Sequence, residues 1–188
     1  MKLGFGESAN RMPRIKPASL PKLKTHIAVR VGVDQEAGLP AGARILPLQR
    51  HPDERGYFME VVRLPLLKKL AFQLRQVSVS ETCPGVVKAF HYHRRQSDLF
   101  CPLGGEFRIV LLDARARSAT HGHGWSIYTG KDKPFLLHIP PLVAHGYEVL
   151  GRSPATMLYL TNREYDPSDE LRAAWNDPAI GFPWSRTL

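Results

Sequence analysis

The sequence predicts an all-β fold, an antiparallel barrel or sandwich built from many short strands. Apolar runs of five to nine residues recur from Arg44 onward, and they are rich in β-branched and aromatic residues. Turn formers bound these runs, and almost nowhere does a helical period separate them. The chain has 188 residues, of which 43% are hydrophobic, which suits one domain with a sizeable core.

Nine segments are expected to form strands, because each alternates or concentrates apolar residues and ends near Gly, Pro, Asp or Ser. In chain order they are ARILPL (43–48), YFMEVVRL (57–64), QVSVSET (76–82), GVVKAFHYH (85–93), EFRIVLLDA (106–114), WSIYTG (125–130), FLLHIP (135–140), HGYEVLG (145–151) and ATMLYLT (155–161). LPLLKKLAF (64–72) has room for a turn or two of helix.

A short C-terminal helix is expected over DPSDELRAAW (166–175). Asp166 is placed as an N-cap, Pro167 occupies the first helical position, and Glu170 lies in the first turn. These three signals together are typical of a helix N-terminus.

Residues 1–43 are predicted to be a basic, partly disordered arm in front of a domain at 44–188. The first 30 residues contain seven Lys or Arg and a single Glu. The arm lacks the interleaved aromatics of a nucleic-acid stacking platform and the moment of an interfacial helix, so neither partner is expected. Deleting residues 1–30 is therefore expected to leave the melting temperature almost unchanged.

Location is predicted from what the chain does and does not contain. No run approaches the roughly 18 apolar residues of a membrane span, and the N-terminus has no apolar signal core. Cys83 and Cys101 do not make a disulfide framework, which favours a reducing compartment. A cytoplasmic protein is expected.

The stretch GVVKAFHYHRRQSDLFCPLGG (85–105) carries the first functional signal. His91 and His93 are two residues apart, so on a strand they share a face. Asp98, or His145 from IPPLVAHGY, is the candidate third group. A metal site, an acid–base site and a structural strand all remain open, and Asp98 has the alternative of pairing with Arg94 or Arg95 while holding His93 by a hydrogen bond.

The spacing resembles the two motifs of the cupin superfamily. The first motif has a glycine, His-x-His, a carboxylate and a second glycine; the second has Pro-x-Gly followed by a histidine. The matching residues are Gly85, His91, His93, Asp98 and Gly105, then Pro140, Leu142 in place of glycine, and His145. This resemblance implies that His91, His93, Asp98 and His145 can bind one divalent metal ion.

A narrower resemblance extends from Arg44 to Trp184, to the dTDP-4-dehydrorhamnose 3,5-epimerase family, a metal-free branch of the cupins. The matching stretches are DERGYFME, SVSET with GVVKAFH, LLDARARSATHG, IPPLVAHGYEVL, MLYLTNREYDP and WNDPAIGFPW. The resemblance implies a cupin-type jelly roll, a homodimer, a nucleotide-linked 4-keto sugar as substrate and no cofactor.

Residue roles follow from the same resemblance. His91 is the implied base, which removes a proton acidified by the C4 ketone, and Tyr159 is the implied acid. Arg55 and Glu60 are the implied substrate contacts that reach the site across the homodimer, and Lys88 and His145 complete the substrate-binding set.

Four departures from the family pattern leave rival functions open. Asp98 aligns with a family lysine near the developing O4 charge, Lys88 with an arginine, and Glu164 with a tyrosine that stacks on thymine. The aspartate that partners the base in other members lies beyond the end of SRTL. A sugar-nucleotide-binding barrel without catalysis and a metal-dependent cupin enzyme on another substrate are the alternatives.

Overall fold

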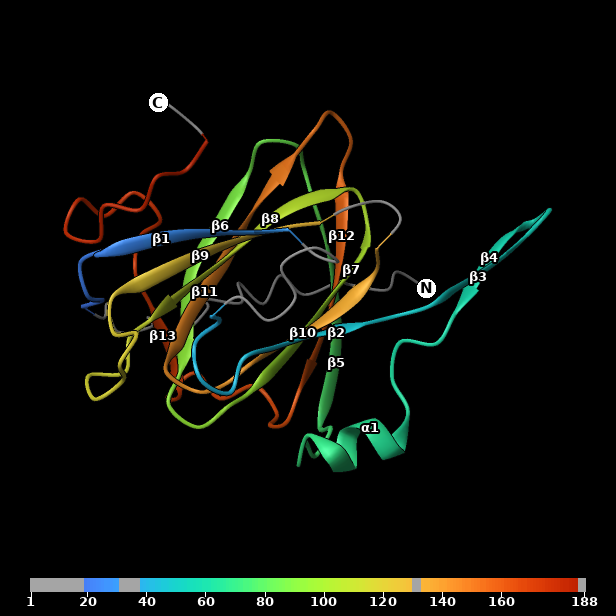
Figure 1. Cartoon of the computed structure of the whole chain (residues 1–188), viewed down its shortest axis with the longest axis horizontal. Coiled ribbons are helices and arrows are strands. Elements are labelled where there is room, and N and C mark those ends of the chain that lie inside the picture. Colours follow the sequence, from blue (N-terminus) through green and yellow to red (C-terminus); the bar gives the residue numbers. More distant parts are fainter. Residues whose placement is uncertain (1–18, 31–37, 130–132, 186–188) are drawn as a thin grey trace, which may run out of the picture.

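Two sheets face each other and form a flattened barrel in the computed structural model, which describes residues 19–30, 38–129 and 133–185 (Figure 1). The elements are β1 Thr25–Arg30, β2 Arg44–Pro47, β3 Arg50–Asp53, β4 Gly56–Met59, α1 Leu64–Lys69, β5 Gln76–Thr82, β6 Val87–His93, β7 Asp98–Gly104, β8 Glu106–Asp113, β9 His123–Tyr128, β10 Phe135–Ile139, β11 Val143–Leu150, β12 Ala155–Thr161 and β13 Glu170–Arg172. This all-β jelly-roll architecture confirms the predicted fold class.

Strand order explains which segments meet at the barrel interior. One sheet has the order β1-β9-β8-β11-β6-β13, and the other has the order β2-β10-β7-β12-β5. All pairs in these sheets are antiparallel except β1 with β9. The inward faces of both sheets bury large side chains such as Trp125, Phe107 and Phe135, which are at most 1% exposed.

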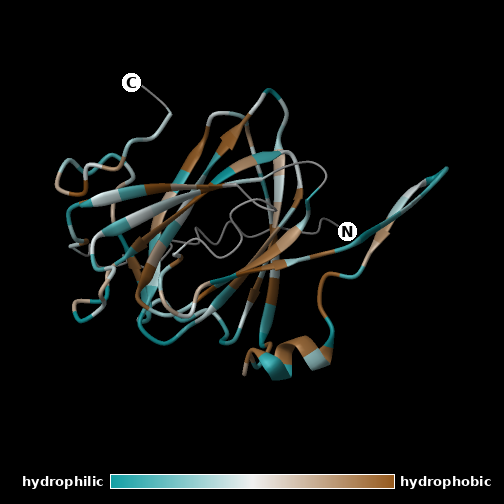
Figure 2. Cartoon of the chain, viewed as in Figure 1, coloured by the Kyte–Doolittle hydropathy of each residue, from teal (hydrophilic) through white to brown (hydrophobic). Residues whose placement is uncertain are grey.

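The outer faces of both sheets are covered as well, so several strands are buried on both sides. Phe182 and Ile180 of the C-terminal segment pack on the outside of the six-stranded sheet, against Phe90. Leu67 of α1 packs with Leu99 on the outside of the other sheet. Apolar colour therefore runs along strands as well as between them, while loops are hydrophilic (Figure 2).

The helix expected at 64–72 is α1, which begins at Leu64 with a proline in its first turn and ends after Lys68 and Lys69. The described part of the chain contains no helix with the length and apolar character that a membrane span requires.

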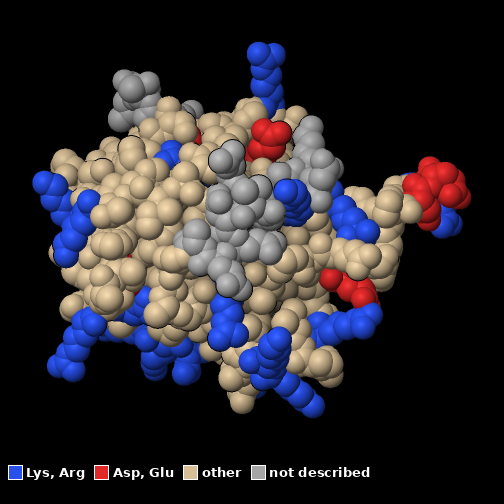
Figure 3. Space-filling model, viewed as in Figure 1, with Lys and Arg blue, Asp and Glu red and all other residues tan. Residues whose placement is uncertain are grey.

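The hairpin β3–β4 projects away from the barrel (Figure 1). Its exposed side chains include Phe58 and Tyr57, at 65% and 49% exposure. Figure 3 shows acidic side chains gathered at the tip of this hairpin, whereas Lys and Arg side chains are spread over the rest of the visible face.

Three predictions of local structure were wrong. Residues 166–175 form turns and the strand β13 in place of a C-terminal helix, because Glu170–Arg172 pairs with the edge of β6. The boundary at residue 44 is too late, since β1 pairs with β9 and buries Val29 completely. Residues 1–18 and 31–37 of the predicted arm lie outside the described residues.

The strand β7 was also not predicted, although it lies in the interior of the five-stranded sheet. Pro102 argued against a strand there, because proline cannot donate to a ladder. The structure accommodates Pro102 beside an irregularity in the pairing of β7 with β12, next to Met157. β7 carries Asp98 at its first residue, so this omission also affected the site.

Candidate active site

A cavity of about 220 Å³ lies between the two sheets and gathers four of the residues singled out in the sequence. His91 and Lys88 of β6 and His145 of β11 line one wall, and Tyr159 of β12 lines the wall opposite. The other residues that line it are Ser80, His93, Phe100, Gly146 and Tyr147.

His91 has a carboxylate partner that the sequence analysis missed. Its Nδ1 lies 2.7 Å from Oε1 of Glu170. Because a carboxylate only accepts hydrogen bonds, Nδ1 of His91 carries the proton and Nε2 keeps a lone pair. This is the state that a general base requires.

The charge of Glu170 is held by its neighbours. Its side chain is 6% exposed, and Arg172 donates to it at 2.9 Å through Nε. Burial raises the pKa of Glu170, but hydrogen bonds from His91 and Arg172 outweigh burial and lower the pKa to about 2. Glu170 is therefore a carboxylate at neutral pH that orients His91 and stabilises its protonated form.

A β-bulge in β6 brings Lys88 onto the same wall as His91. Tyr147 pairs with Lys88 and His145 with His91, so three residues of β6 span what two residues of β11 span. In a regular strand, Lys88 and His91 would point to opposite faces. Gly146 of β11 permits this close packing, because a Cβ there would lie 2.6 Å from the carbonyl oxygen of Lys88.

Tyr159 belongs to a network of hydroxyl groups. Its oxygen lies 2.9 Å from that of Tyr147 and 2.9 Å from Oγ of Ser80, and Thr82 lies 3.0 Å from Tyr147. Burial raises the pKa of Tyr147, but hydrogen bonds with Ser80, Thr82 and Tyr159 lower it overall. Burial and the neighbouring Tyr147 raise the pKa of Tyr159. Tyr159 thus holds a proton, and Tyr147 can resupply it.

His93, Asp98 and His145 form a separate cluster on the wall of the same cavity. One potential ligand atom from each residue lies within 4.8 Å of the other two, and His91 is not part of this group. Burial raises the pKa of Asp98, and burial lowers the pKa of His145 to about 3. Of the four predicted metal-binding residues, the structure brings together these three.

The alternative partners predicted for Asp98 are wrong. Arg95 pairs with Asp166 and Asp169. Within the described residues, the printed ion-pair distances to Asp98 come from imidazoles alone: Nε2 of His93 at 3.9 Å and Nε2 of His145 at 3.6 Å. Neither separation is a hydrogen bond.

Arg55 and Glu60 lie outside the cavity of this protomer. Arg55 is at the tip of the projecting hairpin, where it is 81% exposed and contacts Asp53 at 2.6 Å. Glu60 follows β4 and pairs with Arg63. Their predicted contact with substrate across a dimer stays a prediction.

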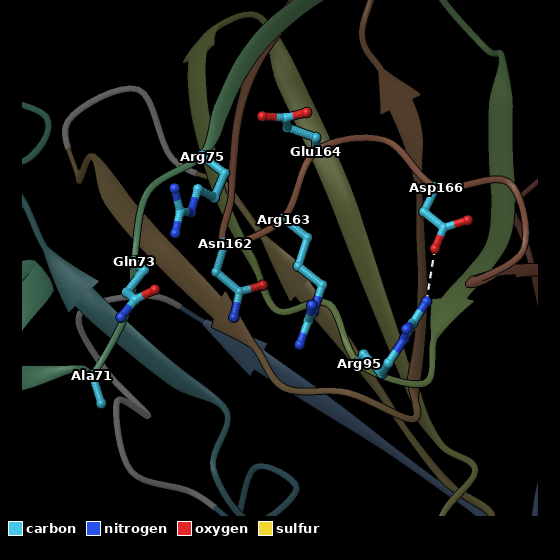
Figure 4. A pocket seen from close by; sticks show the side chains of 8 residues that line it. All are labelled: Ala71, Gln73, Arg75, Arg95, Asn162, Arg163, Glu164 and Asp166. Atoms are coloured by element: carbon cyan, nitrogen blue, oxygen red, sulfur yellow. Dashed lines mark hydrogen bonds and ion pairs between the residues drawn. The ribbon is translucent and has the colours of Figure 1, made fainter.

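A larger hollow of about 440 Å³ lies at the ends of β5 and β12 (Figure 4). Arg75, Arg95 and Arg163 contribute to its lining, and the guanidinium of Arg95 is bound to Asp166. None of its lining residues is a histidine or a tyrosine, so it lacks a group suited to abstract a proton near neutral pH. The smaller cavity is therefore the candidate active site.

Comparison with protein families gives one match over most of the chain. Residues 40–188 match the family described as dTDP-4-dehydrorhamnose 3,5-epimerase. The spore coat polysaccharide biosynthesis protein SpsL of Bacillus subtilis is 44% identical over 146 residues, which cover 77% of this chain and 95% of that protein.

Solved structures show the same relationship. The dTDP sugar isomerase of Desulfovibrio desulfuricans G20 is 30% identical, with a TM-score of 0.74, and the match covers 80% of this chain and 97% of that chain. RmlC of Legionella pneumophila, solved in complex with dTDP-4-keto-L-rhamnose, is 27% identical with a TM-score of 0.69; the match covers 77% of this chain and 79% of that chain.

Proposed function

The chain belongs to the dTDP-4-dehydrorhamnose 3,5-epimerase family, and we propose that it epimerises a nucleotide-linked 4-keto-6-deoxy sugar at C3, C5 or both. The product would enter deoxysugar or surface polysaccharide synthesis, as the name of the spore coat relative suggests. One observation carries the proposal: a base with a carboxylate partner and a tyrosine face each other from opposite sheets of one cavity.

The chemistry begins at the base. Nε2 of His91 takes a proton from the carbon beside the C4 ketone, and the electrons move onto the ketone oxygen as an enolate. His91 becomes an imidazolium, whose charge Glu170 stabilises at 2.7 Å. Glu170 thus takes the part of the aspartate that this chain lacks, which weakens the case for a barrel that only binds.

Tyr159 completes the inversion from the opposite wall. It donates its proton to the face of the carbon away from His91, which inverts the configuration. The 2.9 Å hydrogen bond to Tyr147 gives the resulting phenolate a donor that can reload it.

The dimensions of the cavity separate the sugar from the nucleotide. Sites for drug-sized ligands occupy roughly 300–1,000 Å³, and this cavity measures about 220 Å³. We infer that only the sugar enters it and that the diphosphate lies at the mouth, where Lys88 supplies a positive charge.

A homodimer is part of the proposal, because it gives the projecting hairpin a function. β5 is an edge strand whose Val77 and Val79 are 55% and 64% exposed. Pairing of this edge with a second copy would bury them and bring Arg55 of one protomer to the cavity of the other. A cytoplasmic location is proposed from the free thiols of Cys83 and Cys101.

The test is solvent exchange with a 4-keto nucleotide sugar in D₂O. The wild type is expected to introduce deuterium at C3 or C5, and His91→Ala to lose roughly 10²-fold or more of the exchange rate. Tyr159→Phe is expected to retain exchange while losing net epimerisation, because abstraction precedes reprotonation. Full exchange by His91→Ala would refute the assignment of the base.

A further inference from the structure

Asp98 differs from every other buried carboxylate in the described part of the chain. The other four each have an arginine within 4.0 Å: Asp113 with Arg115, Glu148 with Arg108, Asp169 with Arg95, and Glu170 with Arg172. Asp98 is 4% exposed and faces two imidazoles instead. A buried carboxylate without a cation is costly, so the site lacks a positive charge.

The hydrogen bonds around this cluster show which atoms accept. Nδ1 of His145 lies 3.1 Å from the carbonyl oxygen of Val143, so Nδ1 carries the proton and Nε2 is bare. Nε2 of Gln96 lies 3.2 Å from Nε2 of His93 and 2.8 Å from Oδ1 of Asp98. An amide nitrogen only donates, so Nε2 of His93 is also an acceptor and Oδ2 of Asp98 is left facing both histidines.

Three acceptor atoms therefore converge with no donor between them. A shared proton would bring an oxygen and a nitrogen to about 2.7–3.2 Å, whereas the observed separations are 3.6 and 3.9 Å. Ligands of one metal ion, each about 2.1 Å from it, lie about 3.0–3.5 Å apart. The observed spacing is closer to that of a metal site before its ligands close on the ion.

We propose that His93, Asp98 and His145 bind one divalent first-row transition-metal ion through Nε2 of each imidazole and one carboxylate oxygen. Two nitrogen ligands and one oxygen ligand suit such an ion and leave coordination positions open. Val143 and Gln96 already orient the outer atoms of His145 and Asp98, as supporting residues do around metal sites. On binding, the Gln96 amide gives up its contact with His93 and keeps the one with Asp98.

The geometry also removes a conflict in the sequence interpretation. A metal bound through His91 would deprive the enzyme of its base, but His91 is held by Glu170 and stands outside the cluster. Base and ion can therefore act together in one cavity, which both His91 and His145 line.

The role of the ion rests on the proposed function. Other family members are expected to stabilise the enolate oxygen with a lysine where this chain has Asp98. An ion held by Asp98 restores the positive charge at that place and polarises the C4 ketone as a Lewis acid. The substitution of lysine by aspartate and the presence of His93 then have one explanation.

Metal binding is tested first, independently of activity. Protein dialysed against chelator is titrated with Co²⁺, and its ligand-field absorption and bound cobalt per chain are measured. The wild type is expected to bind one ion, and His93→Ala and Asp98→Asn to bind at least roughly 100-fold more weakly. His91→Ala is expected to bind as the wild type does, and His123→Ala is the matched control outside the cavity.

Asp98→Asn keeps the shape of the side chain, so circular dichroism can show that a loss of binding is not a loss of fold. Substoichiometric cobalt in the wild type, or unchanged affinity in Asp98→Asn, overturns the site. Loss of binding in His91→Ala overturns the three-residue ligand set.

The role of the ion is tested by deuterium exchange before and after reloading. Removing the ion is expected to slow exchange roughly 10²-fold or more, and Co²⁺ to restore it. Equal exchange by both forms overturns the role in enolate stabilisation. If neither form exchanges any 4-keto sugar, the proposed function fails, while the cobalt titration still decides the metal site.

Discussion

Replacing Glu170 by glutamine tests whether the base depends on its buried carboxylate. The pKa of Glu170 falls from 4.5 to about 2, which corresponds to about 3 kcal/mol of favourable interaction with its partners. His91 and Arg172 share that energy, so about half of it, roughly 1.5 kcal/mol, stabilises the imidazolium that forms during abstraction. Glu170→Gln is therefore expected to slow the reaction about 10- to 20-fold.

Initial rates of deuterium exchange over a range of sugar concentrations provide the assay. The loss is expected in kcat with little change in KM, because Glu170 contacts the imidazole and not the substrate. Glu148→Gln is the matched control: the same chemical change in a buried glutamate paired with Arg108, two residues beyond the cavity residue Gly146. Equal rates in the two variants would refute the reasoning.

Three further predictions follow from packing and charge. Gly146→Ala is expected to cost about 1–3 kcal/mol in thermal unfolding and to reduce exchange, because its Cβ meets the backbone of Lys88; Gly104→Ala, which has nothing within 4 Å, is the control, and equal melting temperatures would contradict the clash. Deleting residues 1–30 is now expected to lower the melting temperature by about 6 °C or more, since β1 and the buried Val29 are lost; deletion of residues 1–18 is the comparison, and an unchanged value for the longer deletion would show that β1 adds no stability. Because folding lowers the pKa of Glu170, its stabilisation is present above pH 4.5 and is lost as pH falls toward 2, so the stability gap between wild type and Glu170→Gln should narrow over that window; a constant gap would contradict the shift.

The fold was predictable because strand alternation and turn chemistry are local properties. β5, with alternately buried and exposed residues, is where the sequence placed it. β7 and β13 were missed for a shared reason: a sheet overrode local signals. Pro102 is tolerated at an irregular point of a central strand, and a helix-start pattern at Asp166–Glu170 was outweighed when Glu170–Arg172 paired with β6.

The same override decided what could be known of the site. His91 and His93 were found because residues two apart on one strand share a face, which needs no tertiary information. Glu170 was not found, since its contact with His91 exists only when β13 is a strand at the edge of β6. In the predicted helix, Glu170 was merely an acidic residue of the first turn.

Tyr147 had a signal that went unused. It follows His145 by two residues on β11, so any argument that points His145 into the cavity also points Tyr147 there. Lys88 had no such signal, because only the bulge in β6 turns it toward the cavity. Asp98 shows the remaining limit: its sequence neighbours Arg94 and Arg95 offered a salt bridge, yet Asp166 and Asp169 engage Arg95 from a distant segment. What remains around Asp98 is a pair of imidazoles with bare nitrogens, and that charge imbalance, visible only in three dimensions, is the basis for placing a metal ion beside the base.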